Sequence, residues 1–210
     1  MLKEVFLGRR LSHFRVSPFV KTFIIAETFL WASWNFIFPV LAIFIANKIG
    51  GGSVEVAGIA ASIYYVGRII FELIGGNLVG GLSERRKVLV IIGSILIIGG
   101  AFIGFSFTRT VFWVYFSSGL FGAGLGFSAP ARLALFSVHL DKDKEAMEWS
   151  VTDAVVLVGM ALSAALGGFI AEIYGFNVLF QTAAIVMWLS ALPYAIFLVG
   201  KNTDPHIHRP

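Results

Sequence analysis

Three ionisable side chains stand inside long apolar stretches of this sequence: Glu27, Arg68 and Glu72. Charged groups are rare in such segments, usually face a protein interior or water, and are functional candidates by default. Glu27 lies only about two helical turns from Lys21. It could therefore bind a solute or exchange protons, or it could reach the membrane interface and merely anchor its helix.

Glu27 also begins a stripe on one helical face, because its companions follow at i+4, i+7, i+8 and i+11. These companions are Trp31, Trp34, Asn35 and Phe38. A carboxylate, an amide and three aromatic rings suit an amphipathic or cationic organic molecule, since the rings offer apolar and cation–π surface and the acid offers a counter-charge. The stripe therefore predicts the wall of a small-molecule pocket.

Arg68 and Glu72 are four residues apart, which lets them pair on one helix face, and Tyr64 lies one turn earlier on the same stripe. Glu72 and Glu27 lie at similar depth, so a Glu27–Arg68–Glu72 cluster is geometrically possible. Separating the two charges inside a membrane is costly, so opening and closing this ion pair could serve gating or proton coupling. Alternatively, the two charges neutralise each other and only make insertion of the helix into the membrane easier. Both interpretations stay open. Four other polar residues near the ends of apolar runs are expected at the interface: His139, Asp153, Glu172 and Gln181.

The composition excludes several classes of protein. The chain has 210 residues, of which 58% are hydrophobic and 13% charged, whereas soluble domains carry about 25% charged residues. The net charge of +4 comes from basic residues in short turns, which indicates membrane topology rather than a nucleic-acid partner. The absence of cysteine excludes disulfides and thiolate catalysis. We find no acid–base pair at usable spacing and no convincing metal-ligand cluster, so we expect neither an enzyme nor a cofactor or metal.

Six apolar runs are each long enough to cross a hydrocarbon core, which needs roughly 20 helical residues. Short turns join them, so successive helices should be antiparallel neighbours. We therefore predict an all-α membrane protein with a basic amphipathic arm (1–20), a six-span bundle (21–199) and a tail (200–210). Prolines at 39, 130 and 193 predict kinks. The predicted spans are Lys21–Ala46, Val54–Leu82, Val88–Phe107, Val111–Val138, Val151–Tyr174 and Val178–Val199.

The basic residues predict the orientation. Thirteen of the sixteen Lys and Arg lie in the arm with Lys21, the Arg85–Lys87 turn, the Arg132–Lys144 stretch or the tail. The turns near Lys48 and Arg109 hold one each. Because cytoplasmic loops carry the excess of Lys and Arg, we expect a multi-pass protein of the plasma or inner membrane with both termini cytoplasmic.

A short sequence similarity between the two halves of the chain, here called the glycine echo, accompanies this pattern. Gly75-Gly76-Asn77-Leu78 ends the second span, and Gly167-Gly168-Phe169-Ile170 lies near the end of the fifth. By the topology above, the two glycine pairs face opposite sides of the membrane. Two three-helix units with matching landmarks at opposite faces predict an inverted repeat.

The turn between the second and third spans resembles a signature of the major facilitator superfamily, of the form G-x-L-x-D-R-x-G-R-R. Gly80 stands where the family has an acidic residue, Gly81 replaces the first arginine, and Ser83 replaces a glycine. In that family the acidic residue helps to latch the two halves in the outward-facing state. The residues that fit the signature are Gly76, Leu78, Arg85 and Arg86.

Two further runs resemble motifs of the same family. Gly122, Gly124 and Gly126 match the R-x-x-x-G-x-G-x-G run of the fourth span, with Ser118 at the position of an arginine that often takes part in proton coupling. In the fifth span, Gly159, Gly167 and Gly168 have the spacing of the exporter signature G-x-x-x-G-P-x-x-G-G. Its central Gly-Pro is Ser163-Ala164 here.

The resemblance covers nearly the whole chain and implies the amino-terminal half of a secondary transporter, which normally has two six-span halves with the solute between them. It implies alternating access, and possible proton-coupled efflux of amphipathic or cationic compounds, since multidrug members often carry an acid in the first span. The expected partners are lipid, a small solute and a second six-span half, either another copy or another chain. Alternatively, the chain is a fragment, or a six-span scaffold that does not transport.

Overall fold

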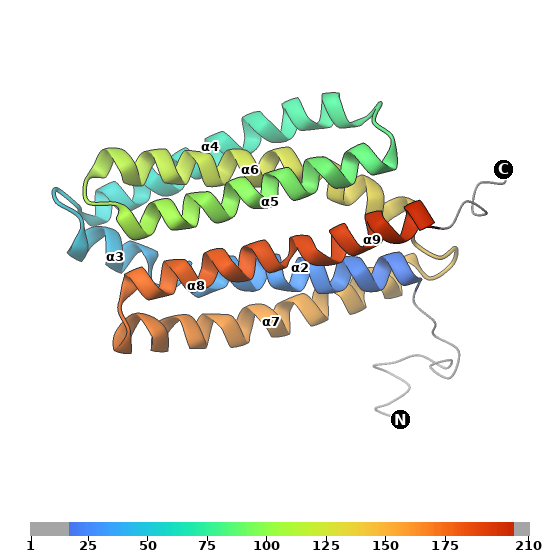
Figure 1. Cartoon of the computed structure of the whole chain (residues 1–210). Helices are drawn as coiled ribbons and strands as arrows, with labels where there is room; N and C mark the ends of the chain where they lie inside the picture. Colours follow the sequence, from blue (N-terminus) through green and yellow to red (C-terminus); the bar gives the residue numbers. More distant parts are fainter. Residues whose placement is uncertain (1–16, 204–210) are drawn as a thin grey trace.

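The computed structural model describes residues 17–203 as a bundle of helices that run roughly parallel to one axis (Figure 1). Residues 1–16 of the predicted basic arm and residues 204–210 of the predicted tail lie outside the described residues, whereas residues 17–20 form the cap and the first turn of α2. Within the described part, six helical segments are long and apolar enough to cross a membrane, as predicted. The helices are α2 (Pro18–Ile37), α3 (Leu41–Lys48), α4 (Val54–Val79), α5 (Glu84–Phe107), α6 (Val111–Val138), α7 (Glu145–Ile173), α8 (Phe176–Leu189) and α9 (Ala191–Thr203).

Two of the six spans are interrupted. The first consists of α2 and α3, which are separated at residues 38–40 around Pro39. The sixth consists of α8 and α9, which are separated at Ser190, three residues before Pro193. Proline removes one helical hydrogen bond and crowds the preceding turn, which accounts for breaks at these places. Pro130, by contrast, lies inside the continuous helix α6.

Three helices begin earlier than the apolar runs suggested. Ser17 caps α2, and its hydroxyl accepts a hydrogen bond from the Val20 N–H at 3.2 Å. Helices α5 and α7 begin at Glu84 and Glu145, so charged residues assigned to turns form their first turns. Acidic side chains are favourable there because they face the positive end of the helix dipole.

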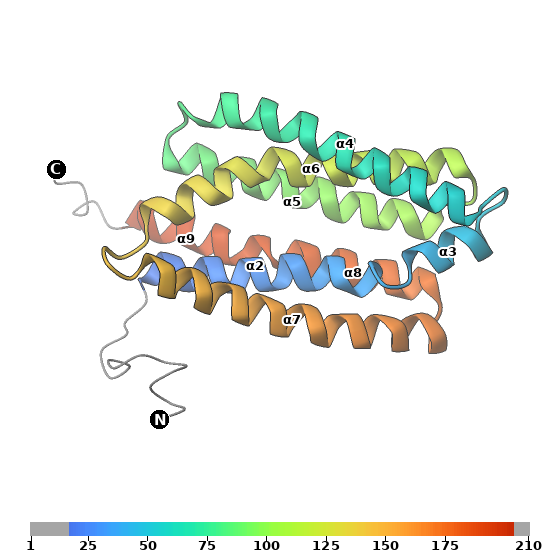
Figure 2. The ribbon, with the colours of Figure 1, turned by 180° about the vertical axis from the view of Figure 1, so that it is seen from behind.

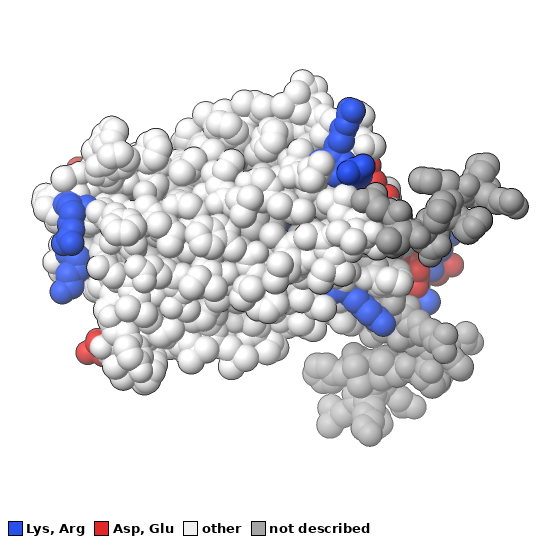
Figure 3. Space-filling model, viewed as in Figure 1, with Lys and Arg blue, Asp and Glu red and all other residues white. Residues whose placement is uncertain are grey.

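The bundle has two ends that differ in their connections. The terminal end holds the beginning of α2, the end of α9 and the α4–α5 and α6–α7 connections, whereas the far end holds α3 and the α5–α6 and α7–α8 connections (Figures 1 and 2). On the face shown in Figure 3, Lys, Arg, Asp and Glu gather at the two ends and leave a broad uncharged belt between them. Such a belt is what a hydrocarbon core requires.

The most extensive contacts are those of α4 with α6, α5 with α6, α2 with α7, α5 with α8, and α2 with α8 and α9. In span order, the second contacts the fourth, the first contacts the fifth and the sixth, and the third contacts the fourth and the sixth. Exchanging spans 1–3 with spans 4–6 leaves this set of pairs unchanged. The packing therefore has the symmetry of the inverted repeat that the glycine echo predicted.

The two glycine pairs behave alike in the structure. A Cβ on Gly75 would lie 3.0 Å from the Phe127 carbonyl oxygen of α6, and a Cβ on Gly167 would overlap the Phe36 carbonyl oxygen of α2. Their neighbours Gly76 and Gly168 have no such contact within 4 Å. Within each pair, then, the first glycine is a packing residue and the second is open. Gly76 and Gly168 thus do not pack against another helix of the described residues.

The other motif glycines bring helices together. Side chains at Gly122 and Gly126 would overlap the backbone of α4 at Tyr64 and Arg68. Gly124 faces α5, and Gly159 faces α2, where an added Cβ would lie 2.7 Å from the Thr28 methyl group. Small residues of this kind let backbones approach closely where helices associate in membranes.

Helices α4 and α7 are the least buried spans, with 11% and 17% of their most apolar windows buried, against 50% for α5 and α6. Both lie along the same face of the bundle, seen in Figure 2. Large apolar side chains such as Ile69, Leu73, Val158 and Leu162 are exposed on them. This face of α4 and α7 therefore carries the apolar surface that the six-span bundle leaves exposed.

Candidate functional site: an ionic cavity in the bundle

Glu27 of α2 pairs with Arg132 of α6 inside the bundle, and both residues are only 5% exposed. One guanidinium nitrogen donates to both carboxylate oxygens, at 2.7 and 2.5 Å. A buried carboxylate and guanidinium are tolerated together because each compensates the desolvation of the other. The pair joins the two inverted units across 105 positions of the chain.

Arg132 was missed as a site residue, because it was counted with the cytoplasmic basic residues up to Lys144. The predicted span Val111–Val138 matches α6, so Arg132 lies inside the span and not in a turn. A signal was present in the chain, since the residues from Leu133 to Val138 are almost entirely apolar. Six more helical residues carry the chain about 9 Å beyond Arg132.

Two further donors hold the Glu27 carboxylate. The Trp31 indole N–H donates to one oxygen at 3.1 Å, and the Tyr194 hydroxyl of α9 donates to the other at 3.5 Å. Tyr194 is fully buried. The acid therefore takes hydrogen bonds from α2, α6 and α9, which satisfies the charge that a buried carboxylate presents.

Arg68 and Glu72 pair as their spacing predicted. The Arg68 Nε lies 3.5 Å from a Glu72 oxygen, and these side chains are 30% and 41% exposed. Arg68 also donates to the Tyr64 hydroxyl at 3.3 Å. Unlike the Glu27 pair, this pair lies at the open surface of α4, where another molecule can reach it.

These two pairs lie around one cavity of about 230 Å³, here called the ionic cavity. The predicted trio therefore shares a cavity, although its contacts differ from the expected cluster: Glu27 binds Arg132, while Arg68 binds Glu72. Asp153, expected at the interface, also lines the cavity, eight residues into α7. The ionisable and aromatic lining residues are Glu27, Trp31, Arg68, Glu72, Arg132, Trp149 and Asp153, with Phe23.

Four predicted site residues do not line the ionic cavity: Trp34, Asn35, Phe38 and Tyr64, of which Phe38 and Tyr64 line the apolar pocket described next. Trp34 joins an aromatic cluster, with ring centroids 5.7 Å from Tyr64 and 4.5 Å from Phe121. It lines a separate, mostly apolar pocket of about 130 Å³, together with Ser118. The Asn35 amide donates to the Trp31 carbonyl of its own helix at 2.9 Å. Neither residue lines the ionic cavity, because α2 turns the second half of the stripe toward α4, α5 and α6.

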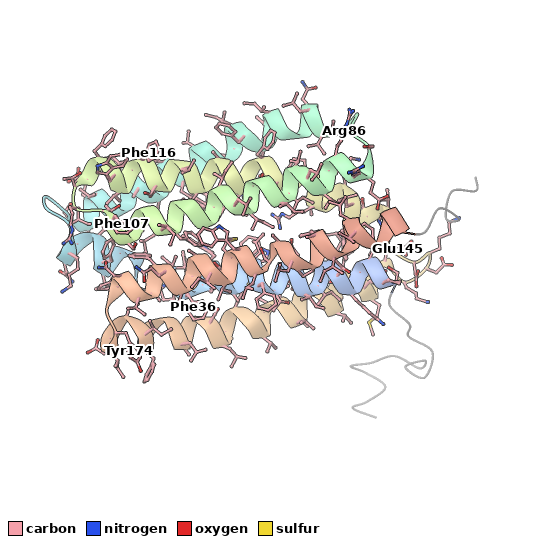
Figure 4. The ribbon with its side chains drawn as sticks, in the orientation of Figure 1. Phe36, Arg86, Phe107, Phe116, Glu145 and Tyr174 are labelled. Carbon is pink, nitrogen blue, oxygen red and sulfur yellow. The ribbon has the colours of Figure 1, made fainter. Side chains whose placement is uncertain are left out.

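The motif turn lies at the terminal end, where Arg85 and Arg86 are exposed on the first turn of α5 (Figure 4 labels Arg86). Their neighbour Glu84 approaches the His139 ring at the end of α6, 3.2 Å between Oε1 and Nε2. The His139 ring stacks on Phe19 of α2 with centroids 4.0 Å apart. The turn thus ties three helices together, and neither arginine lines the ionic cavity.

No group of three or more His, Asp or Glu within residues 17–203 is arranged to hold a metal ion. Four of the five ionisable residues of the ionic cavity form two ion pairs, and Arg68, Glu72 and Asp153 lie on the open side of α4 and α7. Their geometry suits reversible binding of a charged or polar molecule. It offers no nucleophile activated by a neighbouring base.

The chain is similar to several curated proteins. It is 28% identical over 170 residues to the "Multi-drug resistance efflux pump PmrA" of Streptococcus pneumoniae, covering 80% of this chain and 41% of that protein. It is 27% identical to a PmrA homolog of Lactococcus lactis, covering 84% and 43%. It is 24% identical to the "Benzoate transport protein" of Acinetobacter baylyi, covering 97% and 46%. The chain spans less than half the length of these relatives.

Among solved structures, the fold is similar to that of tetrameric PepTSo2, with a TM-score of 0.69 at 15% identity, covering 92% of this chain and 43% of that chain. The family model described as "Major Facilitator Superfamily" matches residues 23–210. That match takes in all six spans and the residues of the ionic cavity. The chain therefore belongs to the major facilitator superfamily, and its six-span bundle corresponds to one half of a transporter of that family.

Proposed function

We propose that this chain is one half of a secondary transporter that moves a small amphipathic or cationic organic solute outward in exchange for protons. The observation that carries the proposal is the convergence of three carboxylates and two guanidinium groups on one cavity inside a membrane bundle. An isolated charged side chain inside a membrane bundle is energetically costly, so a cluster of five such side chains is best explained by a functional role. The rings of Trp31 and Trp149 add surface for the apolar part of the solute.

A second six-span half is part of the proposal. The Arg68–Glu72 pair and Asp153 lie on the exposed sides of α4 and α7, where hydrocarbon would be a poor solvent for them. A second half over this face would enclose the ionic cavity and leave water within it. The relatives of about twice this length are consistent with two such units.

Competition for carboxylates gives a simple coupling mechanism. A cationic solute and a proton each neutralise the same acid, so binding one disfavours the other. Protonating Glu27 would also leave the Arg132 guanidinium without its main acceptor, and Glu72 and Asp153 are the other acids lining the cavity. The two arginines could then exchange acceptors as the cavity opens to one side or the other. We place the terminal end in the cytoplasm, following the distribution of Lys and Arg.

Replacing Glu27 with Gln should abolish the pH dependence of transport; the amide oxygen keeps a neutral acceptor for Arg132, and far-UV circular dichroism checks that the variant is folded. The measurement is uptake of a cationic aromatic dye into proteoliposomes that contain the full chain, with and without a pH gradient. Glu55→Gln serves as the matched control, because Glu55 is an exposed acid in the first turn of α4. Unchanged pH-dependent uptake in Glu27→Gln would remove Glu27 from the coupling mechanism.

The competing proposal is a six-span scaffold that does not transport, which the motif departures at Gly80 and Ser118 favour. The two proposals differ in what covers Asp153. Because the chain has no cysteine, an Asp153→Cys variant carries a single thiol. A water-soluble thiol reagent should label it in the assembled protein if a cavity remains, as it labels Lys48→Cys at the far end. Full protection in the assembled state, with labelling only after dissociation, would favour the scaffold.

A further inference from the structure

A second cavity, unconnected with the ionic cavity, opens at the far end of the bundle between α3, α5, α7 and α8. Its volume is about 640 Å³, within the roughly 300–1,000 Å³ range of small-molecule sites. We call it the far groove. Its lining combines charged side chains from three segments with an apolar floor, and no residue of the proposed transport mechanism belongs to it.

The charges of the far groove have both signs. Lys48 and Arg109 supply two cations, and Glu172 supplies a carboxylate. A backbone hydrogen bond of 3.1 Å from the Gly50 N–H to the Arg109 carbonyl fastens together the segments that carry the two cations. Among the ion pairs within the described residues, none involves Lys48, Arg109 or Glu172. The three charges are thus available to a ligand that carries both signs.

The floor of the far groove is apolar and has room. Val40, Ile43 and Phe44 line it from the α2–α3 break and α3, and Gly168 lines it from α7. A Cβ at Gly168 would meet no such contact within 4 Å. The open member of the second glycine pair, which makes no packing contact, therefore helps to keep this groove empty of side chains.

The groove lies where lipid headgroups lie. It is formed by the ends of membrane spans, and Tyr174, which lines it, is 62% exposed at the same end (Figure 4). Tyrosine is enriched at this depth because its ring is amphipathic. A lining that combines charged and apolar side chains at the ends of membrane spans matches a molecule that carries both a charged headgroup and hydrocarbon.

We propose that the far groove binds the headgroup of a zwitterionic phospholipid with a primary ammonium, namely phosphatidylethanolamine. Its phosphate is held by Lys48 and Arg109, its ammonium donates to Glu172, and the upper acyl chain lies on Ile43 and Phe44. A purely anionic lipid satisfies the two cations but leaves the Glu172 carboxylate unmatched. A choline headgroup carries the charge but has no N–H to donate.

The test is native mass spectrometry of the full chain in nanodiscs of phosphatidylcholine doped with phosphatidylethanolamine or phosphatidylglycerol. The wild-type chain should retain phosphatidylethanolamine preferentially. Glu172→Gln should weaken retention of phosphatidylethanolamine about two- to five-fold, as for one partly exposed ion pair, and leave phosphatidylglycerol unchanged. Lys48→Ala combined with Arg109→Ala should weaken both lipids, whereas Lys21→Ala combined with Lys142→Ala removes two exposed cations elsewhere and should weaken neither.

Gly168→Leu provides a variant that keeps every charge and fills the groove. It should displace the lipid, while Gly93→Leu, at another helical glycine with open space, should not. Thermal unfolding of each variant checks that the bundle is intact. Equal retention of the three lipids, or retention unaffected by both Glu172→Gln and Gly168→Leu, would overturn the proposal. If soluble glycerophosphoethanolamine binds as tightly as phosphatidylethanolamine, the ligand is a soluble compound with this headgroup and not a lipid.

Discussion

Replacing Arg132 with Met should destabilise the bundle by about 3–5 kcal/mol, the usual effect of removing one partner from a buried ion pair. The Glu27 carboxylate would stay in the interior with only Trp31 and Tyr194 as donors. Unfolding in mixed detergent micelles, followed by far-UV circular dichroism, measures the change. Lys142→Met is the matched control, because Lys142 is exposed and its loss should change the free energy of unfolding little.

The double variant Glu27→Leu, Arg132→Met distinguishes a pair from two independent residues. It removes both charges, so part of the lost stability should return, less about 1–3 kcal/mol for each buried donor left without its acceptor. Transport should stay absent in this variant even though the fold is recovered. If the double variant is as unstable as the sum of the single ones, the two residues do not act as a pair.

Replacing Gly126 with Ala should destabilise the bundle by about 1–3 kcal/mol or more, although only one methyl group is added. The new Cβ would overlap the Arg68 carbonyl oxygen, so α4 and α6 must separate. Backbone cannot move aside as the end of a flexible side chain can. The displacement would also shift Arg68 and Glu72 relative to Arg132, so solute binding should weaken with stability. The same unfolding experiment measures the first effect, and dye binding the second.

Gly76→Ala is the matched control for this experiment. Gly76 lies in the helix α4 that Gly126 contacts, but a Cβ there meets no such contact within 4 Å. Alanine is favoured over glycine in a helix interior by roughly 0.5–1 kcal/mol, so this variant should be slightly more stable than the wild type. Equal effects of the two substitutions would show that the close approach of α4 and α6 is not what Gly126 provides.

Local spacing was enough to predict part of the site. The i, i+4 separation of Arg68 and Glu72 places both on one helix face whatever surrounds that helix, and the pair is found as predicted. The same applies to the six apolar runs, whose length and hydropathy predict helices that are able to cross a membrane. The glycine echo predicted the inverted repeat because two helices can cross closely only where a small residue lies between them. Small residues can be recognised directly in a sequence.

The partner of Glu27 could not be predicted in this way. Which residue meets it depends on how α2 and α6 are rotated and how deep each lies, and helical periodicity within one segment contains neither quantity. Trp34 shares a stripe with Glu27, yet it packs against Phe121 because the stripe is long enough to pass from one cavity to another. The span Val111–Val138 was predicted correctly, but Arg132 inside it was overlooked because a basic residue was taken as the mark of a turn.

The pairing of Glu27 with Arg132 also bears on how the chain is made. At about 5–20 residues per second, the 105 residues between them take on the order of 5–20 s to synthesise. Throughout that time the first span has its acid but not the guanidinium that later compensates it, and its main neighbour α7 has not yet emerged. The first half of the bundle must therefore wait, incompletely assembled, for the second half. Newly made α2 is the segment most in need of protection at the membrane during synthesis.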